Sequence, residues 1–493
     1  MNRAELLARV ADRGERWDVL VIGGGATGLG AALDAVTRGY RTLLLERGDF
    51  ACATSSRSTK LIHGGVRYLR QGNLALVCES LRERELLLRN APELVKPLAF
   101  VVPGYRWWEK PYYAIGLGLY GLLSGGTLPR PQMLSREKTL AHLPSLNPQN
   151  LRGGELYYDA QFDDARLAIA VMQAIAERGG VPLNYVRVSS LLKQNERICG
   201  VRAVDLESGT ENEIEARVVI NATGVFSDSV RRLDDSNAPQ MLAPSQGAHI
   251  VLPASFLPGD AALMIPRTDD GRVLFAIPWL GRLLVGTTDT PVREIAPEPR
   301  PLDSEIDFLL EHITRYFTKN PTRADVLSVF AGLRPLVKNV ETQQTSKLAR
   351  DHVIEISRSG LVTITGGKWT TFRKMGEDAI DAAAKVGELE KRASGTKNVR
   401  LNNRCNTEQS ELLHAGLPYR SGDVLFAARC EMARTVEDVL ARRTRALFLD
   451  AKASIEMAPR VARLLASELA RDENWECQQV RALTELARDY LPP

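Results

Sequence analysis

The sequence has little of several features that mark common classes of protein. Its six cysteines are scattered and form no C-x-x-C pair, so neither a zinc site nor a disulfide framework is indicated. No apolar run reaches the roughly 18 residues that a membrane-spanning helix needs, and Met1 to Trp17 has no signal-peptide core. The 64 basic residues nearly balance the 60 acidic ones, which argues against nucleic acid as a partner. We therefore expect a protein of a reducing compartment that holds no metal ion.

A glycine-rich turn near the N-terminus is typical of dinucleotide-binding proteins. The apolar run Asp18–Ile22 predicts a buried parallel strand, and it leads directly into GGGATG at residues 23–28. The glycines have G-x-G-x-x-G spacing, which combines a tight turn, close approach of a pyrophosphate and close packing of helix on strand. Cofactor contacts are expected there from Gly23, Gly25, Thr27 and Gly28.

The residues after this turn extend the fingerprint. They predict a helix that ends at Arg38-Gly39, then an apolar strand, Thr42–Leu45, that leads into Glu46. An acidic residue in this position accepts hydrogen bonds from the ribose hydroxyls of an adenine dinucleotide, so we expect Glu46 to contact the cofactor. Its carboxylate would repel a 2′-phosphate, and NADP is therefore not expected. Cys52 lies close behind and is interpreted as a packing residue.

Two later segments predict the rest of a flavin-binding domain. Arg217–Thr223 and Leu361–Ile364 are apolar strands followed by glycine, and the second leads into a glycine pair and a helix. A glycine pair that opens a helix offers N–H groups and a positive dipole end, which suits a flavin ring that becomes anionic on reduction. Cofactor contacts are expected there from Ala222, Gly224, Gly366 and Gly367.

Three cofactor-binding segments so far apart predict a domain that is discontinuous in sequence. The chain of 493 residues is long enough for two to four domains. The expected fold class is α/β (mixed α+β), with a Rossmann-like FAD-binding domain, an inserted substrate domain built on an antiparallel sheet, and a helical C-terminal cap. The expected limits are 1–75, 165–245 and 345–390 for the FAD-binding domain, 76–164 and 246–344 for the substrate domain, and 391–493 for the cap.

Several longer runs carry a resemblance to a known family. They are VIGGGATGLG at 21–30, CATSSRSTKLIHGGVRYL at 52–69, the turn Gln246–His249, VGTTD at 285–289, GLRPL at 332–336, RDH at 350–352 and TGGKWTTFRKMGEDA at 365–379. Together they resemble the FAD-dependent glycerol-3-phosphate dehydrogenases of the quinone-linked respiratory type. The resemblance extends over nearly the whole chain and is looser in the C-terminal region.

The resemblance implies that the chain oxidises sn-glycerol 3-phosphate to dihydroxyacetone phosphate. Hydride would pass from C2 of the substrate to N5 of non-covalently bound FAD, and ubiquinone would take the electrons onward. Arginine suits the phosphate because its planar charge binds phosphate oxygens in pairs. The implied site residues are His249 and Arg334 as catalytic groups, Arg67, Tyr68, Arg350 and Lys368 as substrate contacts, and Thr54, Ser55, Ser58, Lys60 and His63 as further cofactor contacts.

Two questions stay open at this point. The hydroxyl proton must pass to a base, for which His249 is the chemically easier choice, while the family match keeps Arg334 in contention. The function itself has two alternatives. One is an FAD-dependent oxidase or dehydrogenase of an amino acid or 2-hydroxy acid, which would bind a carboxylate and need fewer cationic groups. The other is a non-catalytic flavin-binding protein.

The location of the protein depends on Pro111–Gly126, an aromatic and apolar segment that follows Trp107, Trp108 and Lys110. It predicts either a buried helix or a contact with the headgroup region of a membrane. The resemblance implies a cytoplasmic protein attached peripherally to the inner membrane, because ubiquinone is lipid-soluble. A lipid surface is therefore an expected partner besides substrate and quinone, and a homodimer remains open.

Overall fold

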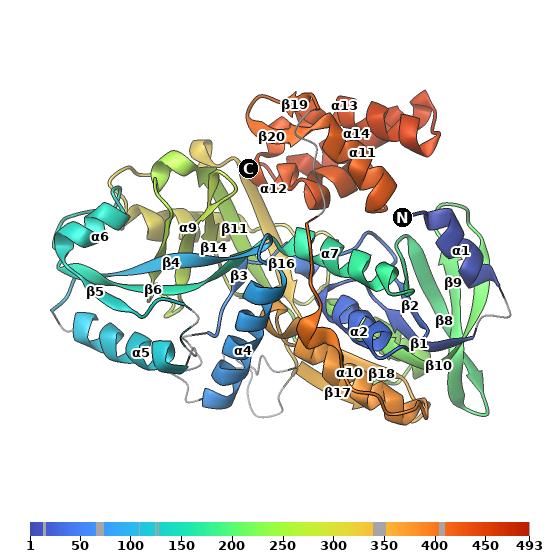
Figure 1. Ribbon diagram of the computed structural model, residues 1–493. Coiled ribbons are helices and arrows are strands. Elements are labelled where there is room, and N and C mark those ends of the chain that lie inside the picture. The colour runs from blue at the N-terminus through green and yellow to red at the C-terminus, as the bar shows by residue number, and fades with distance from the viewer. Residues whose placement is uncertain are drawn as a thin grey trace.

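The computed structural model describes residues 1–12, 16–65, 73–107, 109–123, 126, 128–338, 352–403 and 410–492. They form three parts: a largely parallel sheet with helices, a largely antiparallel sheet with helices, and a helical C-terminal part (Figure 1). The predicted fold class is confirmed.

The first part is built on a sheet with the strand order β17-β18-β10-β1-β2-β7, from which β8 and β9 branch at β10. The strands from β18 to β7 pair in parallel, and β17 is antiparallel at the edge. The bounds are β1 Trp17–Ile22, β2 Thr42–Leu45, β7 Val181–Leu183, β8 Val186–Gln194, β9 Arg197–Asp205, β10 Glu211–Asn221, β17 His352–Ile356 and β18 Val362–Gly366. Neighbouring strands thus come from all three predicted cofactor-binding segments.

Both faces of this sheet are covered, which is why its central strands read as continuous apolar runs. Val19 and Val21 of β1 belong to a core shared with α2, α7 and α10, whereas Leu20 and Ile22 belong to a core shared with α1 and the β8–β9 pair. The helices of this part are α1 Arg3–Ala11, α2 Ala26–Thr37, α7 Asp164–Glu177, α8 Ser227–Asp234 and α10 Phe372–Val386.

The second part has a ten-stranded sheet in the order β15-β11-β14-β13-β12-β4-β6-β3, with β16 beside β11 and β5 beside β6. Its strands are β3 Leu61–Ile62, β4 Val95–Gly104, β5 Gln132–Leu134, β6 Gly153–Phe162, β11 Ser245–Pro253, β12 Ala261–Ile265, β13 Leu274–Trp279, β14 Arg282–Gly286, β15 Thr290–Pro291 and β16 Ser328–Arg334. Its helices are α4 Leu74–Asn90, α5 Glu109–Leu123, α6 Arg136–His142 and α9 Asp303–Thr314. The inserted antiparallel sheet that the sequence predicts is therefore present.

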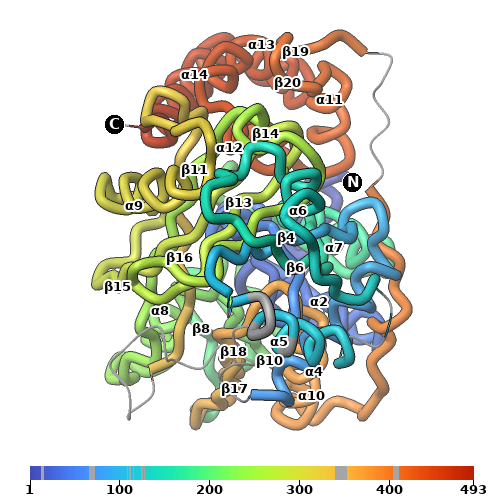
Figure 2. Tube along the Cα trace, turned by 90° about the vertical axis from the view of Figure 1, so that its left-hand side faces the viewer, coloured from blue at the N-terminus to red at the C-terminus, as the bar shows by residue number. Residues whose placement is uncertain are grey.

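The C-terminal part lies over this second sheet, at one end of the molecule in both views (Figures 1 and 2). Val251 and Phe330 of the sheet belong to its apolar core, whereas Ile250 belongs to the core on the α9 side. Alternate residues of β11 therefore face the two covering layers. The elements are β19 Leu412–His414, β20 Leu417–Arg420, α11 Ser421–Cys430, the π-helical turn Asp438–Arg443, α12 Ala446–Leu449, α13 Ala451–Leu469 and α14 Glu473–Arg488.

Strand pairing and packing place two boundaries away from the expected limits. Leu61 pairs with Gln161, so the chain enters the second sheet at β3 rather than near residue 76. Val399 and Leu401 lie in the core of the first part, so that part continues beyond residue 391. Both differences arise from contacts between distant residues, which local sequence patterns do not reveal.

The segment Pro111–Gly126 supplies most of α5. One face of this helix is buried, as expected of a buried helix, and the other is exposed, as a contact with a membrane requires. Leu117 and Tyr120 are buried, whereas Leu119 and Leu122 are exposed. Within the described residues, no helix combines the length and the apolar character that crossing a membrane requires.

Candidate active site

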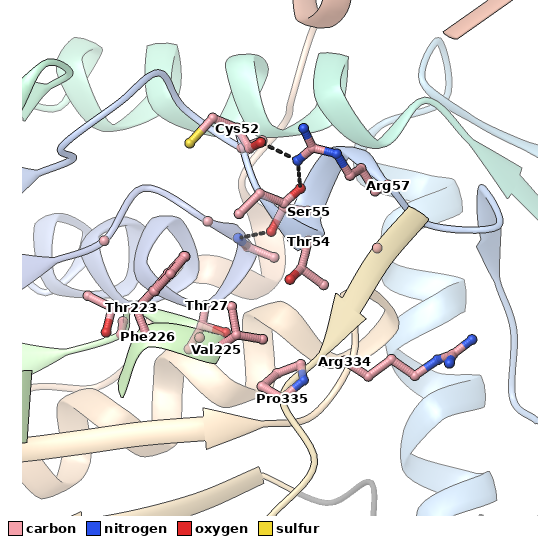
Figure 3. A pocket seen from close by; sticks show the side chains of 18 of the residues that line it. Thr27, Cys52, Thr54, Ser55, Arg57, Thr223, Val225, Phe226, Arg334 and Pro335 are labelled. Atoms are coloured by element: carbon pink, nitrogen blue, oxygen red, sulfur yellow. Dashed lines mark hydrogen bonds between the residues drawn. The ribbon is translucent and has the colours of Figure 1, made fainter. Parts of the chain in front are cut away.

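A cavity lies where the strands of the first sheet end and the second sheet approaches them. Its volume of about 540 Å³ is in the range of ligand sites. Residues that follow β1, β2, β10 and β18 line it, because the carboxyl ends of parallel strands meet at one edge of the sheet. Residues of β11 and β16 line it from the second sheet, among them Arg334 at the end of β16 (Figure 3).

The glycine turn between β1 and α2 forms part of the wall. Gly23 has a φ of 112°, and its N–H donates to the carbonyl of Leu45 over 2.8 Å, which ties the turn to β2. A Cβ on Gly28 would lie 1.8 Å from the carbonyl oxygen of Gly23, so helix and turn are in direct contact. Gly25 caps α2 without a side chain, and the first turn of the helix lines the cavity. Its N–H groups suit a pyrophosphate.

Glu46 lines the cavity at the end of β2. Its Oε2 accepts a hydrogen bond from the N–H of Gly24 over 2.6 Å, and its Oε1 accepts one from Gly48 over 2.8 Å. Burial raises the pKa of this carboxyl, and the two N–H groups act in the opposite direction. The carboxylate therefore braces the glycine turn, and its contact with a ribose stays a prediction.

The polar segment before β3 supplies further lining residues. Of the five cofactor contacts expected from residues 54–63, four line the cavity: Thr54, Ser55 and Ser58 before β3, and His63 after it. Ser55 Oγ accepts from the N–H of Ala26 over 2.9 Å (Figure 3), and Thr54 Oγ1 donates to the carbonyl of Leu333 over 2.7 Å. The segment thus connects the first turn of α2 to β16.

Lys60 does not line the cavity, so its expected role as a cofactor contact has to be corrected. Its side chain is fully buried, where the ammonium pairs with Asp164 at 2.7 Å and donates to the carbonyl of Ser56 over 2.6 Å. Burial lowers the pKa of Lys60, and the Asp164 carboxylate opposes that shift. The lysine fastens the polar segment to α7 because the ion pair spans the two.

The glycine pair after β18 forms another stretch of the wall. Gly366 and Gly367 have φ values of 82° and 70°, a region that residues with side chains rarely adopt. A Cβ on Gly367 would also lie 2.4 Å from Sδ of Met375. Lys368 follows directly and lines the cavity before α10 begins. Ala222 and Gly224 line it at the end of β10.

His249 and Arg334 come from the paired strands β11 and β16. Gly247 of β11 is directly opposite Gly332 of β16. His249 and Arg334 each follow one of these glycines by two positions on the same strand. Because alternate residues of a strand point to the same side, all four lie on one face of the sheet. A Cβ on Gly247 would lie 2.4 Å from Nη2 of Arg334. Only glycine at this position therefore lets the arginine lie across the sheet surface on the side of His249.

Arg334 is held by the VGTTD segment. Its Nη1 donates to Asp289 Oδ1 over 3.1 Å, and its Nη2 donates to Thr287 Oγ1 over 3.1 Å and to the carbonyl of Thr288 over 3.0 Å. Arginine stays protonated in proteins, so this network fixes the orientation of a charged guanidinium on the cavity wall, with the Asp289 carboxylate as its ion-pair partner.

The His249 imidazole is buried at the same wall. It stacks on Phe330 with ring centroids 4.8 Å apart, and its Nε2 lies 2.9 Å from Thr59 Oγ1. Burial first, then the charges of Lys60 and Arg334, hold the pKa of the imidazole well below its usual 6.5. At neutral pH the ring is therefore in the form that can accept a proton.

The sequence did not predict some of the residues that line the cavity, because no motif marks them as site residues. Arg57 is buried on the cavity wall (Figure 3). It pairs with Glu298 at 2.5 Å. Arg47 has its guanidinium 4.2 Å from the ring centroid of Phe226, and both line the cavity. Arg47 directly follows Glu46, which was the only sequence signal for it.

Arg67, Tyr68 and Arg350 lie outside the described residues, so their contacts with substrate stay predictions.

The lining residues fit FAD. The first turn of α2 suits its pyrophosphate, Glu46 suits its ribose, and Val188, Phe226 and Leu233 offer apolar surface for a flat ring. Burial raises the pKa of the Cys52 thiol far above its usual value, so this lining sulfur stays protonated and is suited to packing. A dinucleotide site of this kind beside a neutral histidine and a fixed cation defines a flavin-dependent oxidoreductase.

Comparisons with known proteins agree with this class. Residues 18–373 match the family described as FAD dependent oxidoreductase, and residues 364–476 match the C-terminal domain of alpha-glycerophosphate oxidase. The chain is 40% identical to the mitochondrial glycerol-3-phosphate dehydrogenase of Macaca fascicularis and 39% identical to that of Homo sapiens, in each case over 96% of this chain and 73% of the relative.

Solved structures give the same result. The glycerol-3-phosphate dehydrogenase from Bacillus halodurans complexed with FAD superposes with a TM-score of 0.81 at 30% identity, covering 99% of this chain and 98% of that one. The glycine oxidase of Geobacillus kaustophilus, at 18% identity and a TM-score of 0.57, shares the fold over 79% of this chain and 100% of its own. The chain therefore belongs to the FAD-dependent glycerol-3-phosphate dehydrogenases, and its cofactor is FAD.

Proposed function

We propose that the protein oxidises sn-glycerol 3-phosphate to dihydroxyacetone phosphate. The observation that carries this proposal is that the buried imidazole of His249 and the anchored guanidinium of Arg334 line the same cavity wall. The family to which the chain belongs supports the substrate. Lys368 on the glycine turn adds a further cation, which suits a dianionic phosphate better than a single carboxylate.

Different residues of the cavity wall serve different steps of the reaction. Bound FAD supplies the hydride acceptor, at N5 of its ring. His249 accepts the proton of the C2 hydroxyl, and Thr59 holds the imidazole in orientation through Nε2. Arg334 stabilises the negative charge that develops on the same oxygen. Lys368 binds the phosphate, together with Arg67 and Arg350.

Anaerobic reduction of the bound flavin tests the substrate. sn-Glycerol 3-phosphate should bleach the flavin absorption, whereas glycerol, which lacks the phosphate, should do so poorly. Lactate and small amino acids represent the alternative oxidase or dehydrogenase. If one of them bleached the flavin faster than sn-glycerol 3-phosphate, the proposed substrate would be wrong, and bleaching by none would favour a non-catalytic flavin protein.

A lysine variant tests the phosphate contact. Lys368→Met should raise the substrate concentration for half-maximal reduction roughly 10- to 150-fold, because a hydrogen bond to a charged group contributes about 1.5–3 kcal/mol. Lys374→Met is the matched control, since Lys374 is on α10, the helix that follows Lys368, where it pairs with Asp378 and does not line the cavity. Equal effects of the two changes would remove Lys368 from the phosphate site.

We also propose ubiquinone as electron acceptor and peripheral attachment to the cytoplasmic face of the inner membrane. A lipid-soluble acceptor must be reached from the bilayer, and α5 offers a suitable surface. Leu122 is 77% exposed, Leu119 is 45% exposed, and Trp107 just before the helix is 77% exposed. Arg136 and Lys138, which are exposed further along the chain, would attract anionic lipid at about 1 kcal/mol each.

Flotation with anionic liposomes tests the attachment. Changing both Leu119 and Leu122 to Ser should abolish flotation, while Leu117 is kept because it is buried. A control with Leu206 and Leu302 changed to Ser removes two leucines elsewhere that are 44% and 50% exposed, and it should float normally. Flotation of both variants alike would exclude α5. For the acceptor, a water-soluble ubiquinone analogue should reoxidise the reduced flavin much faster than oxygen does.

A further inference from the structure

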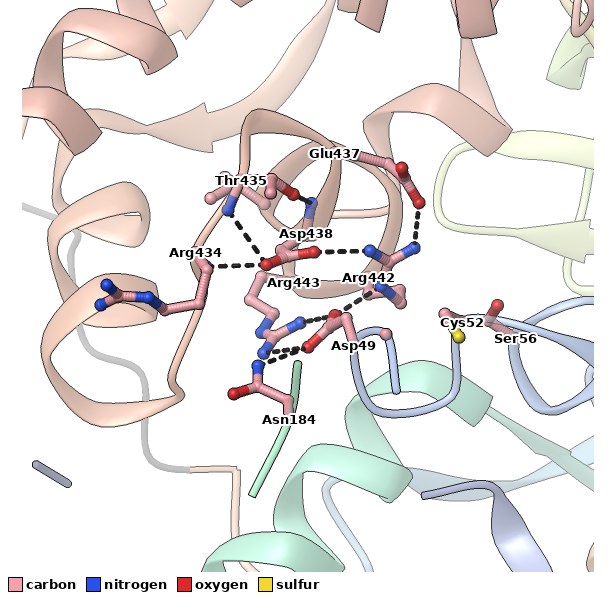
Figure 4. A network of polar contacts seen from close by, with 12 residues as sticks. Asp49, Cys52, Ser56, Asn184, Arg434, Thr435, Glu437, Asp438, Arg442 and Arg443 are labelled. Atoms are coloured by element: carbon pink, nitrogen blue, oxygen red, sulfur yellow. Dashed lines mark hydrogen bonds and ion pairs between the residues drawn. The ribbon is translucent and has the colours of Figure 1, made fainter. Parts of the chain in front are cut away.

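The C-terminal part makes a buried, charged contact with the loop that follows Glu46 (Figure 4). Asp49 of this loop is 1% exposed. Its carboxylate accepts from Nε of Arg442 over 2.5 Å and from both terminal nitrogens of Arg443, one of them at 3.0 Å. Both arginines are buried in the π-helical turn of the C-terminal part, so the contact joins segments 393 and 394 residues apart.

The charges of this cluster are balanced. Arg442 also pairs with Asp438 at 2.6 Å, and Asp438 accepts from the hydroxyl of Tyr185 over 2.6 Å. Burial would raise the pKa of Asp49, but Arg443 and Arg442 outweigh it and lower the pKa. The two buried carboxylates thus face two buried guanidiniums in an interior where an unpaired charge is costly. Glu437, which is 38% exposed, also pairs with Arg442 at 2.6 Å. Such a cluster fixes geometry, since each member has several partners.

The loop that carries Asp49 lies directly on the glycine turn. The N–H of Ala51 donates to the carbonyl of Gly24 over 3.0 Å, and the N–H of Cys52 donates to the carbonyl of Asp49 over 3.1 Å. Glu46, at the beginning of the loop, accepts from the N–H of Gly24. Two hydrogen bonds therefore join the loop to the turn, and together they form the wall that suits the adenosine half of FAD.

We propose that Arg442 and Arg443 are positioning residues of the FAD site. By holding Asp49 they fix residues 46–52, and through Ala51 they fix the glycine turn. The C-terminal part thereby contributes to cofactor affinity, although none of its described residues lines the cavity. Another buried pair at the same interface, Arg166 with Glu431 at 2.6 Å, joins the side chains of α7 and the C-terminal part. The backbone carbonyl of Glu431 also accepts from Arg443 over 2.6 Å, and a change of the side chain leaves that carbonyl in place.

Titration of the apoprotein with FAD, followed by flavin fluorescence, tests this role. Asp49→Asn should raise the Kd for FAD about tenfold or more, because the loop loses its charged anchor. Glu431→Gln is the control: it neutralises an equally buried carboxylate at the same interface, lowers the melting temperature comparably and should change the Kd less than threefold. A Kd for Asp49→Asn that is unchanged, or shifted no more than in the control, would overturn the proposal.

Amide hydrogen exchange of the unaltered protein gives a second test that does not depend on a variant folding. Coupling between two sites is reciprocal, so FAD must stabilise the contact that stabilises it. Adding FAD to the apoprotein should slow exchange in residues 438–443 by a larger factor than in α13 and α14 of the same part. Equal slowing in both regions would show general stabilisation only and would contradict the proposal.

Discussion

Two buried histidines show how surroundings decide the chemistry of a side chain. His249 lines the cavity beside cations, and the described residues supply only Thr59 as its hydrogen-bond partner. His312 is 3% exposed on α9, where Nδ1 lies 2.8 Å from the carbonyl of Phe308 and Nε2 accepts from the N–H of Asp269. One ring is placed to exchange a proton with a ligand, and the other completes a helix contact.

Replacing His249 should slow the chemical step more than it weakens binding. We expect His249→Gln to reduce the rate of anaerobic flavin reduction about 100-fold or more, because the hydroxyl proton loses its acceptor. The substrate Kd from the saturation of that rate should change little. Stopped-flow absorption measures both, and His312→Gln serves as a buried-histidine control away from the cavity. A near-normal rate in His249→Gln would make another group the base.

The low pKa of His249 also predicts a pH dependence of stability. The unfolded chain has the usual pKa of 6.5 and the folded chain a lower one, so below pH 6.5 the unfolded state binds more protons. The stability contributed by the neutral ring is present above that pH and is lost as the pH falls toward the folded pKa. Urea unfolding should show this loss in the wild type, at up to about 1.4 kcal/mol per pH unit, and not in His249→Gln. Parallel profiles of the two proteins would mean that His249 titrates normally.

At the scale of elements, the helices α2 and α10 are in contact through two glycines. A Cβ on Gly30 would lie 2.5 Å from the carbonyl oxygen of Phe372, and a Cβ on Gly376 would lie 2.3 Å from that of Gly30. The backbones are therefore closer than side chains allow. Since α2 begins at the glycine turn and α10 follows Gly366–Lys368, this contact sets the separation of the two cavity walls.

Gly376→Ala should consequently damage both stability and cofactor binding. The added methyl group meets backbone that cannot rotate away, and overpacking of this kind costs about 1–3 kcal/mol. We expect a lower melting temperature and a weaker FAD Kd. Gly118→Ala on α5 is the control, because open space surrounds that position and alanine favours a helix by about 1 kcal/mol. Unchanged FAD affinity in Gly376→Ala would show that the helix separation does not control the cavity.

Local sequence patterns predicted most helices and strands. They could not predict contacts between residues that are far apart in the sequence. The turn at residues 23–28 and the strand ending before Glu46 were readable because strand period and glycine spacing act within a few residues. Lys60 could not be placed, because its position depends on Asp164, 104 residues away. The same holds for Asp49, whose partners belong to a part of the chain with few motifs.

At the scale of the whole molecule, the cavity is shared between parts that fold from separate segments. Its lining comes from residues 22–63, 186–249, 297, 332–336 and 366–375. A ligand that fills the cavity contacts both sheets. Its binding energy therefore stabilises the whole folded chain and not one domain alone.

Ligands that fill different lengths of the cavity should therefore stabilise the protein unequally. ADP carries the adenosine and pyrophosphate that Glu46 and the first turn of α2 suit, whereas FMN carries only the flavin half with one phosphate. We expect each to raise the melting temperature of the apoprotein slightly and FAD to raise it by more than the two shifts together, because joining the halves makes the second contact intramolecular. For FAD the shift should grow with concentration, reaching about 2.7 kcal/mol of stabilisation at 100 times Kd. Thermal unfolding followed by circular dichroism measures all three. An FMN shift equal to that of FAD would contradict recognition of the adenosine half and, with it, the role given to Glu46 and its loop.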